Sequence, residues 1–595
     1  MYQNTNKVME ISLHKKNSPM NTAELIIELI EEAGVEYIFG IPGGAIEDLN
    51  TALHQSDKIM PVITKHEEGA AFMADGYARV SGRLGICCAT AGPGASNLIT
   101  GLASSQADSI PVCAFTGQVA TSVFGKGAVQ ESGSEGINIT SVFSNFTKYS
   151  GMLINEKRAQ YMVQKAFHLA MAGRSGPVHL SLPADLMKKT VIRDERPNHQ
   201  TPAYFFDSDE VNTAAEILVR AKRPIIIAGW GVVLSRGADE LRKLAEQLNI
   251  PVATSPKAKG IFPESHPLSL GVLGFAGSPV AEEFIIKQDV DVLLAVGTSF
   301  NEMMTDGWNE RLHPSSHLIQ IDVDVEEIGK NYPVTLGLCG DANIVMQEIG
   351  SAVNRVFTTL NPYDDAGDYT RNPSRCQEIK DLKTKYKVSS ISEATDPDLY
   401  NPGKLVIDLQ QSCPADTIFF ADIGNSMAWA IRHLEIDRPY SFFLALGFAS
   451  MGYAVAAPVG AKLAAPDRPV VAMVGDGSFL MNGFEVATAV NYKIPVIWVV
   501  FNNAMLGTVY HGRKLFKEPV PEGLPSCFER VDYVKIAEGL GARGIRLDAS
   551  TPISRDLIKE IIETGRPTVI DVLIDETAVP PIHNRIRTVD KHFQP

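Results

Sequence analysis

One stretch in the carboxyl-terminal part of the chain constrains its fold more than any other. The apolar run Val470–Val474 ends in Gly475-Asp476-Gly477-Ser478, a helix-length segment follows, and a second apolar run, Pro495–Phe501, ends in Asn502-Asn503. This alternation predicts a right-handed βαβ unit, in which both strands end at the carboxyl edge of a parallel sheet. The aspartate and the second asparagine are therefore expected to face one point.

These two side chains suggest what the edge of the sheet binds. A carboxylate and an amide oxygen are hard ligands, which suit Mg²⁺ or Ca²⁺ and not zinc. Gly475 and Gly477 would let the backbone approach a phosphate group, and the helix that starts after Ser478 offers free N–H groups to it. A lone Gly-Asp-Gly is usually only a turn, but its pairing with Asn503 at a second strand end favours a metal and phosphate site.

The length of the chain indicates several domains, because single cores stop growing near about 250–300 residues and the chain has 595. Apolar runs alternate with amphipathic stretches in each part, which predicts α/β units with parallel sheets. We expect a flexible extension at 1–20, a first unit at 21–190 and a central unit at 207–356. A linker at 357–403, a third unit at 404–575 and a tail at 576–595 complete the prediction.

Composition excludes several classes of function. The net charge of −15 argues against nucleic acid, whose binding needs clustered basic residues. No apolar run is long enough to span a bilayer. The seven cysteines have no CxxC spacing, so reduced thiols are expected. The polar N-terminal segment lacks the apolar core of a secretion signal, so we expect a cytoplasmic protein.

A second candidate half-site lies in the first unit. The segment PVITKHEEGAAFMADGYARVSGR predicts a strand and then a helix that begins near Glu67, and TAGPGASN follows another strand. An acid at a helix start is ordinarily a solvated capping residue. Here it stands between FGIPGG and a GxxAVQE segment. This series resembles the first domain of the acetolactate synthase family, which belongs to the pyruvate oxidase-like thiamine diphosphate enzymes. The Gly-Asp-Gly and double Asn match the cofactor motif of the same family.

The resemblance covers about residues 21–575 and implies a fold of three doubly wound parallel-sheet domains. Their order would be pyrimidine-binding, central and diphosphate-binding. It implies catalytic roles for Glu67, which would hydrogen-bond the cofactor's aminopyrimidine ring, and for Gln130, beside the reacting carbon. Met451 would bend the cofactor. Asp476, Asn503 and the main-chain oxygen of Met505 would bind Mg²⁺. The cofactor contacts it implies are Pro42, Gly43, Glu67, Pro93, Asn97, Gly424, Asn425, Ser426, Ala449, Met451, Gly475, Asp476, Gly477, Ser478, Asn503, Met505, Leu506 and Gly507.

The activity implied is decarboxylation of a 2-oxo acid, with pyruvate the expected donor, and transfer of the acyl-carbanion unit to an acceptor carbonyl. By the same resemblance the chain should form a homodimer or homotetramer with the active site between subunits. A decarboxylase that protonates the same unit is the first alternative. A flavin-dependent oxidase and a non-catalytic binding protein are the others.

Three departures from the family bear on the substrate and on flavin. Val129 precedes Gln130 where the family has an aromatic residue, and Gly512 stands at the place of a tryptophan. The segment Ser299–Glu302 replaces the family's FDDR, so flavin (FAD) binding stays open. His511 and Arg513 follow the metal loop. His511 could act as a second acid or base and Arg513 could meet a carboxylate, unless both lie on a solvated loop.

Overall fold

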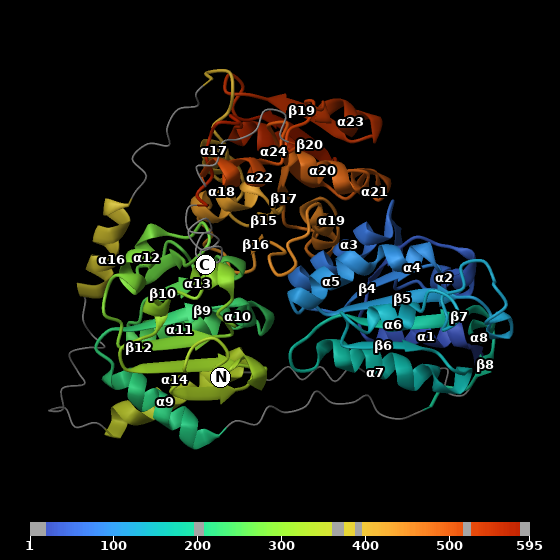
Figure 1. Cartoon of the computed structure of the whole chain (residues 1–595), viewed down its shortest axis with the longest axis horizontal. Coiled ribbons are helices and arrows are strands. Elements are labelled where there is room, and N and C mark those ends of the chain that lie inside the picture. The colour runs from blue at the N-terminus through green and yellow to red at the C-terminus, as the bar shows by residue number, and fades with distance from the viewer. Residues whose placement is uncertain (1–18, 195–206, 360–373, 387–395, 516–524, 583–595) are drawn as a thin grey trace.

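The computed structural model describes residues 19–194, 207–359, 374–386, 396–515 and 525–582, and it contains three six-stranded sheets. Figure 1 shows the three units as blue, green and orange-red bodies that meet near the middle of the molecule. Nearly all of the extension predicted at 1–20 lies outside the described residues, as does 583–595 of the predicted tail. No helix in the described ranges is long and apolar enough to cross a membrane.

The first sheet has the order β3-β2-β4-β5-β7-β6 with every pair parallel. Its strands are β2 (Tyr37–Gly40), β3 (Met60–Ile63), β4 (Gly85–Ala89), β5 (Val112–Gln118), β6 (Tyr149–Met152) and β7 (Val178–Pro183). Its helices are α1 (Thr22–Glu32), α2 (Glu47–His54), α3 (Glu67–Ser81), α4 (Pro93–Asn97), α5 (Ile99–Ala107), α6 (Ile139–Phe143), α7 (Ala159–Met171) and α8 (Ala184–Met187). A short antiparallel pair, β1 (Met20–Asn21) and β8 (Thr190–Val191), joins the two ends of the unit.

The third sheet has the order β16-β15-β17-β18-β20-β19, also parallel throughout. Its strands are β15 (Ile418–Ala421), β16 (Phe442–Phe443), β17 (Val470–Gly475), β18 (Val496–Asn502), β19 (Arg543–Leu547) and β20 (Thr568–Leu573). Its helices are α17 (Pro402–Ser412), α18 (Asn425–His433), α19 (Tyr453–Ala464), α20 (Asp476–Asn482), α21 (Glu485–Asn491), α22 (Gly507–Leu515), α23 (Tyr533–Gly539) and α24 (Arg555–Thr564). Numbered along each unit, the first and third sheets therefore share one strand order.

The central sheet differs, with the order β11-β10-β9-β12-β13-β14 that is typical of dinucleotide-binding folds. Its strands are β9 (Pro224–Ala228), β10 (Val252–Thr254), β11 (Ser269–Val272), β12 (Val292–Val296), β13 (His317–Asp322) and β14 (Leu336–Cys339). Its helices are α9 (Ser208–Arg220), α10 (Trp230–Leu234), α11 (Ala238–Leu248), α12 (Pro279–Ile286), α13 (Glu302–Thr305), α14 (Ala342–Thr359) and α16 (Ser374–Lys385). The three sheets confirm the predicted fold class.

Local sequence explains how these elements form. A capping box starts α1, where Asn21 Oδ1 accepts from Glu24 N at 2.9 Å and Glu24 Oε2 accepts from Asn21 N at 2.8 Å. Central strands such as β17 and β18 are apolar up to their last residue because helices cover both faces of a parallel sheet. All seven cysteines are free thiols, as expected.

The segment predicted as a linker at 357–403 contains regular structure. Helix α14 continues to Thr359, and α16 packs on the central unit, where Ile379 and Leu382 are buried. Polar residues dominate α16, so its narrow apolar stripe is easily mistaken for linker composition.

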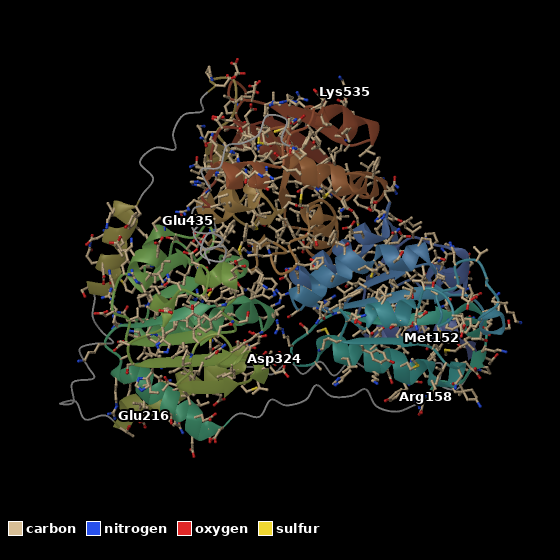
Figure 2. The ribbon with its side chains drawn as sticks, viewed as in Figure 1. Met152, Arg158, Glu216, Asp324, Glu435 and Lys535 are labelled. Atoms are coloured by element: carbon tan, nitrogen blue, oxygen red, sulfur yellow. The ribbon has the colours of Figure 1, made fainter. Side chains whose placement is uncertain are left out.

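Two of the contacts that join the units involve the first unit. Helix α3 of the first unit packs on α19 of the third, where Gly76 and Gly460 allow the two backbones to touch. Arg174 of the first unit forms ion pairs with Asp324 at 3.5 Å and Glu327 at 2.9 Å in the central unit. Figure 2 shows Asp324 on the side of the central unit that faces the first.

Candidate active site

Three chain segments meet at the carboxyl edge of the third sheet. Gly424-Asn425-Ser426 lead from β15 into α18, and Gly475–Ser478 lead from β17 into α20. Asn503–Gly507 lead from β18 into α22. Strands β15, β17 and β18 are neighbours in the sheet, so the three turns lie side by side.

Asp476 is the organising residue of this edge. It is buried, and its carboxylate accepts hydrogen bonds from Asn503 N at 2.9 Å, Ala504 N at 2.6 Å and Gly477 N at 2.7 Å. Burial raises the pKa of Asp476 to about 6, against the lowering effect of these N–H groups. The aspartate thereby ties the turn after β17 to the turn after β18, as the sequence predicts.

The backbone of these turns is unusually constrained. Ala504 and Ala449 are non-glycine residues with φ of 57° and 61°. A Cβ at Gly507 would lie 2.4 Å from Asn425 Nδ2, so a larger residue there would displace the Asn425 side chain. Left-handed alanines cost free energy and persist mainly where function requires the shape. The strained residues therefore flank the metal-loop and cofactor-bending segments that the sequence singles out.

A cavity of about 270 Å³ opens over the three turns. It brings together every third-unit residue that the resemblance assigns to the cofactor, namely Gly424, Asn425, Ser426, Ala449, Met451, Gly475, Asp476, Gly477, Ser478, Asn503, Met505, Leu506 and Gly507. It is also lined by residues that sequence analysis did not identify, among them Phe275 and Met303 of the central unit and Trp429 of α18. No local motif marks these apolar side chains, because their position depends on how the units pack.

The loop that carries Met451 is held in place by hydrogen bonds to Asp422, the residue after β15. The Asp422 carboxylate is fully buried and accepts from Gly452 N at 3.0 Å and from Ala454 N at 2.7 Å. Burial raises the pKa of Asp422 to about 6, and these two N–H groups act in the opposite direction. Asp422 was not identified from the sequence, although its place at a strand end beside Gly424 is a usable signal.

The first unit assembles the second half-site at its own sheet edge. Glu67 is buried at the start of α3, and its Oε2 accepts from Asn97 Nδ2 at 2.9 Å. A Cβ at Gly94 would lie 3.2 Å from Glu67 Oε1. A Cβ at Gly43 would lie 2.6 Å from the Cβ of Thr90. The hydroxyl oxygen of Thr90 is buried and has no hydrogen-bond partner. Glu67 thus stands among the predicted cofactor residues Gly43 and Asn97.

Gln130 lies beside Gly92 in the half-site of the first unit. Its φ is 64°, its side chain packs 3.0 Å from the Cβ position of Gly92, and its carbonyl accepts from the Ser132 hydroxyl. Ser132 Oγ in turn accepts from Gly92 N at 2.8 Å. Val129 beside it is 87% exposed, so within one chain this segment points outward.

The two half-sites do not meet within one chain. Among the described residues, none from the first unit lines the third-unit cavity. Glu485 of α21 instead accepts from the backbone N–H of Lys65 at 3.0 Å and of His66 at 2.9 Å, so α21 packs on the turn before Glu67. One chain therefore presents two separate partial sites.

His511 and Arg513 occupy different environments. His511 is buried, with Nε2 at 3.0 Å from the Glu576 carbonyl and Nδ1 at 2.9 Å from Asn425 Nδ2. Nδ1 also lies 2.9 Å from the Gly507 carbonyl oxygen, so the tautomer of the ring decides which nitrogen donates. Burial lowers the pKa of His511. His511 does not line the cavity, and Arg513 is exposed.

The fold and the two half-sites define a class of protein, and comparison with known families identifies the same class. Residues 20–137, 211–349 and 422–572 match the N-terminal, central and C-terminal domain models of thiamine pyrophosphate enzymes. The order of the matches is the order of the three sheets. The chain is therefore built as a thiamine pyrophosphate (thiamine diphosphate) enzyme.

Its relatives narrow the class. The chain is 35% identical to the probable acetolactate synthase large subunit of Methanococcus aeolicus over 96% of both chains. It is 35% identical to the corresponding protein of Methanocaldococcus jannaschii over 95% of this chain and 93% of the relative. Identity to the acetolactate synthase large subunit of Corynebacterium glutamicum is 33%, over 94% and 87%. The chain belongs to the acetolactate synthase family of thiamine diphosphate enzymes.

Proposed function

We propose that the chain is a carboligase that decarboxylates pyruvate and transfers the two-carbon acyl unit to an acceptor carbonyl. Thiamine diphosphate would supply an electron sink for the negative charge left on the carbonyl carbon when CO₂ departs, which no protein side chain can provide. The observation that carries the proposal is the third-unit cavity, in which all the predicted diphosphate-side residues converge. In the reaction one carbon–carbon bond breaks, one forms, and the acceptor oxygen takes up a proton to give a 2-hydroxy ketone.

Magnesium fits this cavity. The described residues contain no group of three or more His, Cys, Asp or Glu that could hold a metal ion. A site with one carboxylate from Asp476, the amide of Asn503 and the Met505 carbonyl suits Mg²⁺, which takes its remaining ligands from phosphate and water. Gly507, which has no Cβ, would leave the backbone of this loop accessible to a phosphate group.

Glu67 would act at the other end of the cofactor. We propose that its carboxylate shares a proton with the aminopyrimidine ring, with Asn97 fixing its second oxygen. Gln130 would lie near the reacting carbon. Met451, held in place through Asp422, would bend the cofactor so that its two rings meet.

A second copy of the chain would complete the site. Leu480, Met481 and Phe484 on α20 and α21 are exposed, with Phe484 at 70%, and they form an apolar surface next to the cofactor turns. The outward-facing Val129–Gln130 segment would close over the partner's cavity. We therefore propose a homodimer, or a tetramer built from two such dimers, with each site shared between two chains.

Flavin does not fit the central unit well. The N–H groups of Gly229 and Gly231 after β9 donate to the carbonyls of Val296 and Gly297, each at 2.8 Å. A Cβ at Gly229 would lie 2.3 Å from the Gly297 oxygen, so the two turns touch at the position where this fold binds a diphosphate. The cavity at this edge is about 170 Å³. We propose a reaction without flavin chemistry, which disfavours the oxidase alternative.

Product analysis tests the proposal. The protein is incubated with pyruvate, thiamine diphosphate and Mg²⁺, and the products are identified by mass spectrometry. Two pyruvates and a proton should give acetolactate and CO₂, or a related ketol when another acceptor is added. Acetaldehyde as the sole product would instead establish the simple decarboxylase, and the absence of any pyruvate consumption would refute both.

A further inference from the structure

Part of the cofactor cavity is an apolar chamber lined by five side chains. Asn425 and Trp429 lie one turn apart on the same face of α18, so the chamber begins about 6 Å from the phosphate end of the helix. Phe275 and Met303 of the central unit form its opposite wall, with Leu446 and Pro402 beside them. We define these five side chains beyond Asn425 as the apolar chamber.

The wall from the central unit is rigidly built. Phe275 N donates to the Met303 carbonyl at 2.7 Å, which places the two side chains next to each other. Gly274, the residue before Phe275, has a φ of 93°, and a Cβ there would lie 2.4 Å from the Met303 carbonyl oxygen. The Arg432 guanidinium of α18 donates to the Ala276 carbonyl at 3.2 Å and so fastens this wall to the third unit.

The charged groups around the cavity are already engaged. Among the described residues that line it, Asp476 and Asp575 are charged, and neither a lysine nor an arginine is present. Asp476 belongs to the metal end. Asp575 accepts from Thr577 N at 2.8 Å and from its hydroxyl at 2.7 Å. A carboxylate placed in the chamber would lose its hydration without gaining a cation from these walls.

From this arrangement we infer that the apolar chamber binds the substituent of the acceptor, and that the acceptor is a carbonyl compound with an uncharged branched or aromatic side chain. The inference rests on the proposed carboligation and names the substrate class of that site. The two-carbon unit adds to the acceptor carbonyl, whose oxygen takes a proton, while the side chain R stays unchanged in the chamber. An acceptor whose side chain ends in a carboxylate should be used poorly.

An isosteric pair of acceptors provides the test. With pyruvate as donor and thiamine diphosphate and Mg²⁺ present, 4-methylpentanal and 4-oxobutanoate differ mainly by a branched methyl end against a carboxylate. The ketol formed from each is measured as kcat/KM for the acceptor, and CO₂ release from pyruvate is measured in parallel. We expect a preference of at least about tenfold for 4-methylpentanal, and ready use of benzaldehyde.

Two variants localise the effect. Met303→Lys adds a cation to the wall and should reduce or reverse the preference, whereas Val325→Lys adds one to the exposed surface of the same unit and should not. If Met303→Lys loses pyruvate turnover, Phe275→Ala replaces it, and enlarging the chamber should raise the relative use of benzaldehyde over 4-methylpentanal. Equal use of the two isosteric acceptors by the unaltered enzyme would overturn the inference about the acceptor but not the proposed function. An acceptor preference of Phe275→Ala identical to that of the unaltered enzyme would do the same. Absence of CO₂ release would overturn the proposed function as well.

Discussion

The Glu67 carboxylate is buried at the start of α3, whereas the neighbouring Glu68 is only partly buried. Replacement of Glu67 by Gln keeps the shape and the contact with Asn97 but removes the shared proton. We expect turnover to fall by about 10²-fold or more, with a much smaller change in cofactor affinity. Steady-state kinetics across a range of thiamine diphosphate concentrations measures both. Glu68→Gln is the matched control, and equal losses in the two variants would contradict the proton role of Glu67.

Asp422 makes stability depend on pH. Its pKa is about 6 in the folded chain, against an ordinary value near 3.8, so the folded state holds the proton more tightly than the unfolded state. The contribution is fully present below about pH 4 and is lost as the pH rises through 6, a difference of about 3 kcal/mol.

The variant Asp422→Asn removes this titration and also leaves one backbone N–H without an acceptor, at a cost of about 1–3 kcal/mol. Its stability deficit relative to the original chain should therefore be largest near pH 4 and should shrink toward pH 7. Thermal midpoints of both proteins across this range measure the difference. A deficit that stays constant with pH would show that Asp422 does not titrate in this way.

At the scale of elements, α22 is connected to the cofactor edge through His511, which links Asn425 to the Glu576 carbonyl. Loss of the imidazole in His511→Ala should weaken thiamine diphosphate binding by roughly tenfold and change kcat less, because a positioning contact of about 1–2 kcal/mol is removed. Cofactor titration by fluorescence and kinetics separates the two effects. Arg513→Ala on the exposed face of the same helix should leave both unchanged, and a larger effect there would favour a substrate role for the arginine.

The packing of α3 on α19 depends on two glycines. A Cβ at Gly460 would lie 1.9 Å from the Met73 carbonyl oxygen, and one at Gly76 would lie 2.1 Å from that of Ala457. Gly460→Ala should therefore destabilise the chain by about 1–3 kcal/mol. Gly539→Ala, in a helical position with open space around it, should gain up to about 1 kcal/mol. Thermal midpoints of the two variants moving in the same direction would contradict this explanation.

The sequence was most informative about strand ends. Asp476 and Asn503 could be placed at one point because parallel strands in a βαβ unit end at the same edge. Phe275 and Met303 could not, because they come from another unit and reach the cavity only through packing between domains. The contacts of His511 could not be predicted either. Nothing in the local sequence indicates that its ring is buried against a carbonyl 65 positions away.

At the scale of the whole molecule, three units meet around a buried cluster of charge. Arg79 pairs with Asp75 and, at 2.9 Å, with Asp108 in the first unit, and its Nη1 donates to the Leu444 carbonyl in the third. Asp108 also pairs with Lys257 of the central unit at 2.9 Å. Removing one member of such a network leaves a buried charge unpaired. The cluster thereby ties the three units of one chain to one another.

A mixing experiment tests whether the active site is shared between chains. Glu67→Gln and Asp476→Ala each inactivate a different half-site. If both half-sites come from different chains, random exchange makes half of the dimers mixed, and each mixed dimer has one intact site of two. The mixture should then recover about a quarter of the original activity, measured as pyruvate turnover. Phe484→Glu on the exposed apolar surface should prevent recovery. No recovery by freely exchanging subunits would place each site within one chain.

The shared strand order of the first and third sheets also bears on how such a molecule arose. In the proposed complex, two bodies of one architecture would hold opposite ends of a single coenzyme, each with the carboxyl edge of its sheet. A shared strand order of this kind is what duplication of an ancestral domain would leave behind. The central sheet, with its different order, has no part in this pseudosymmetry.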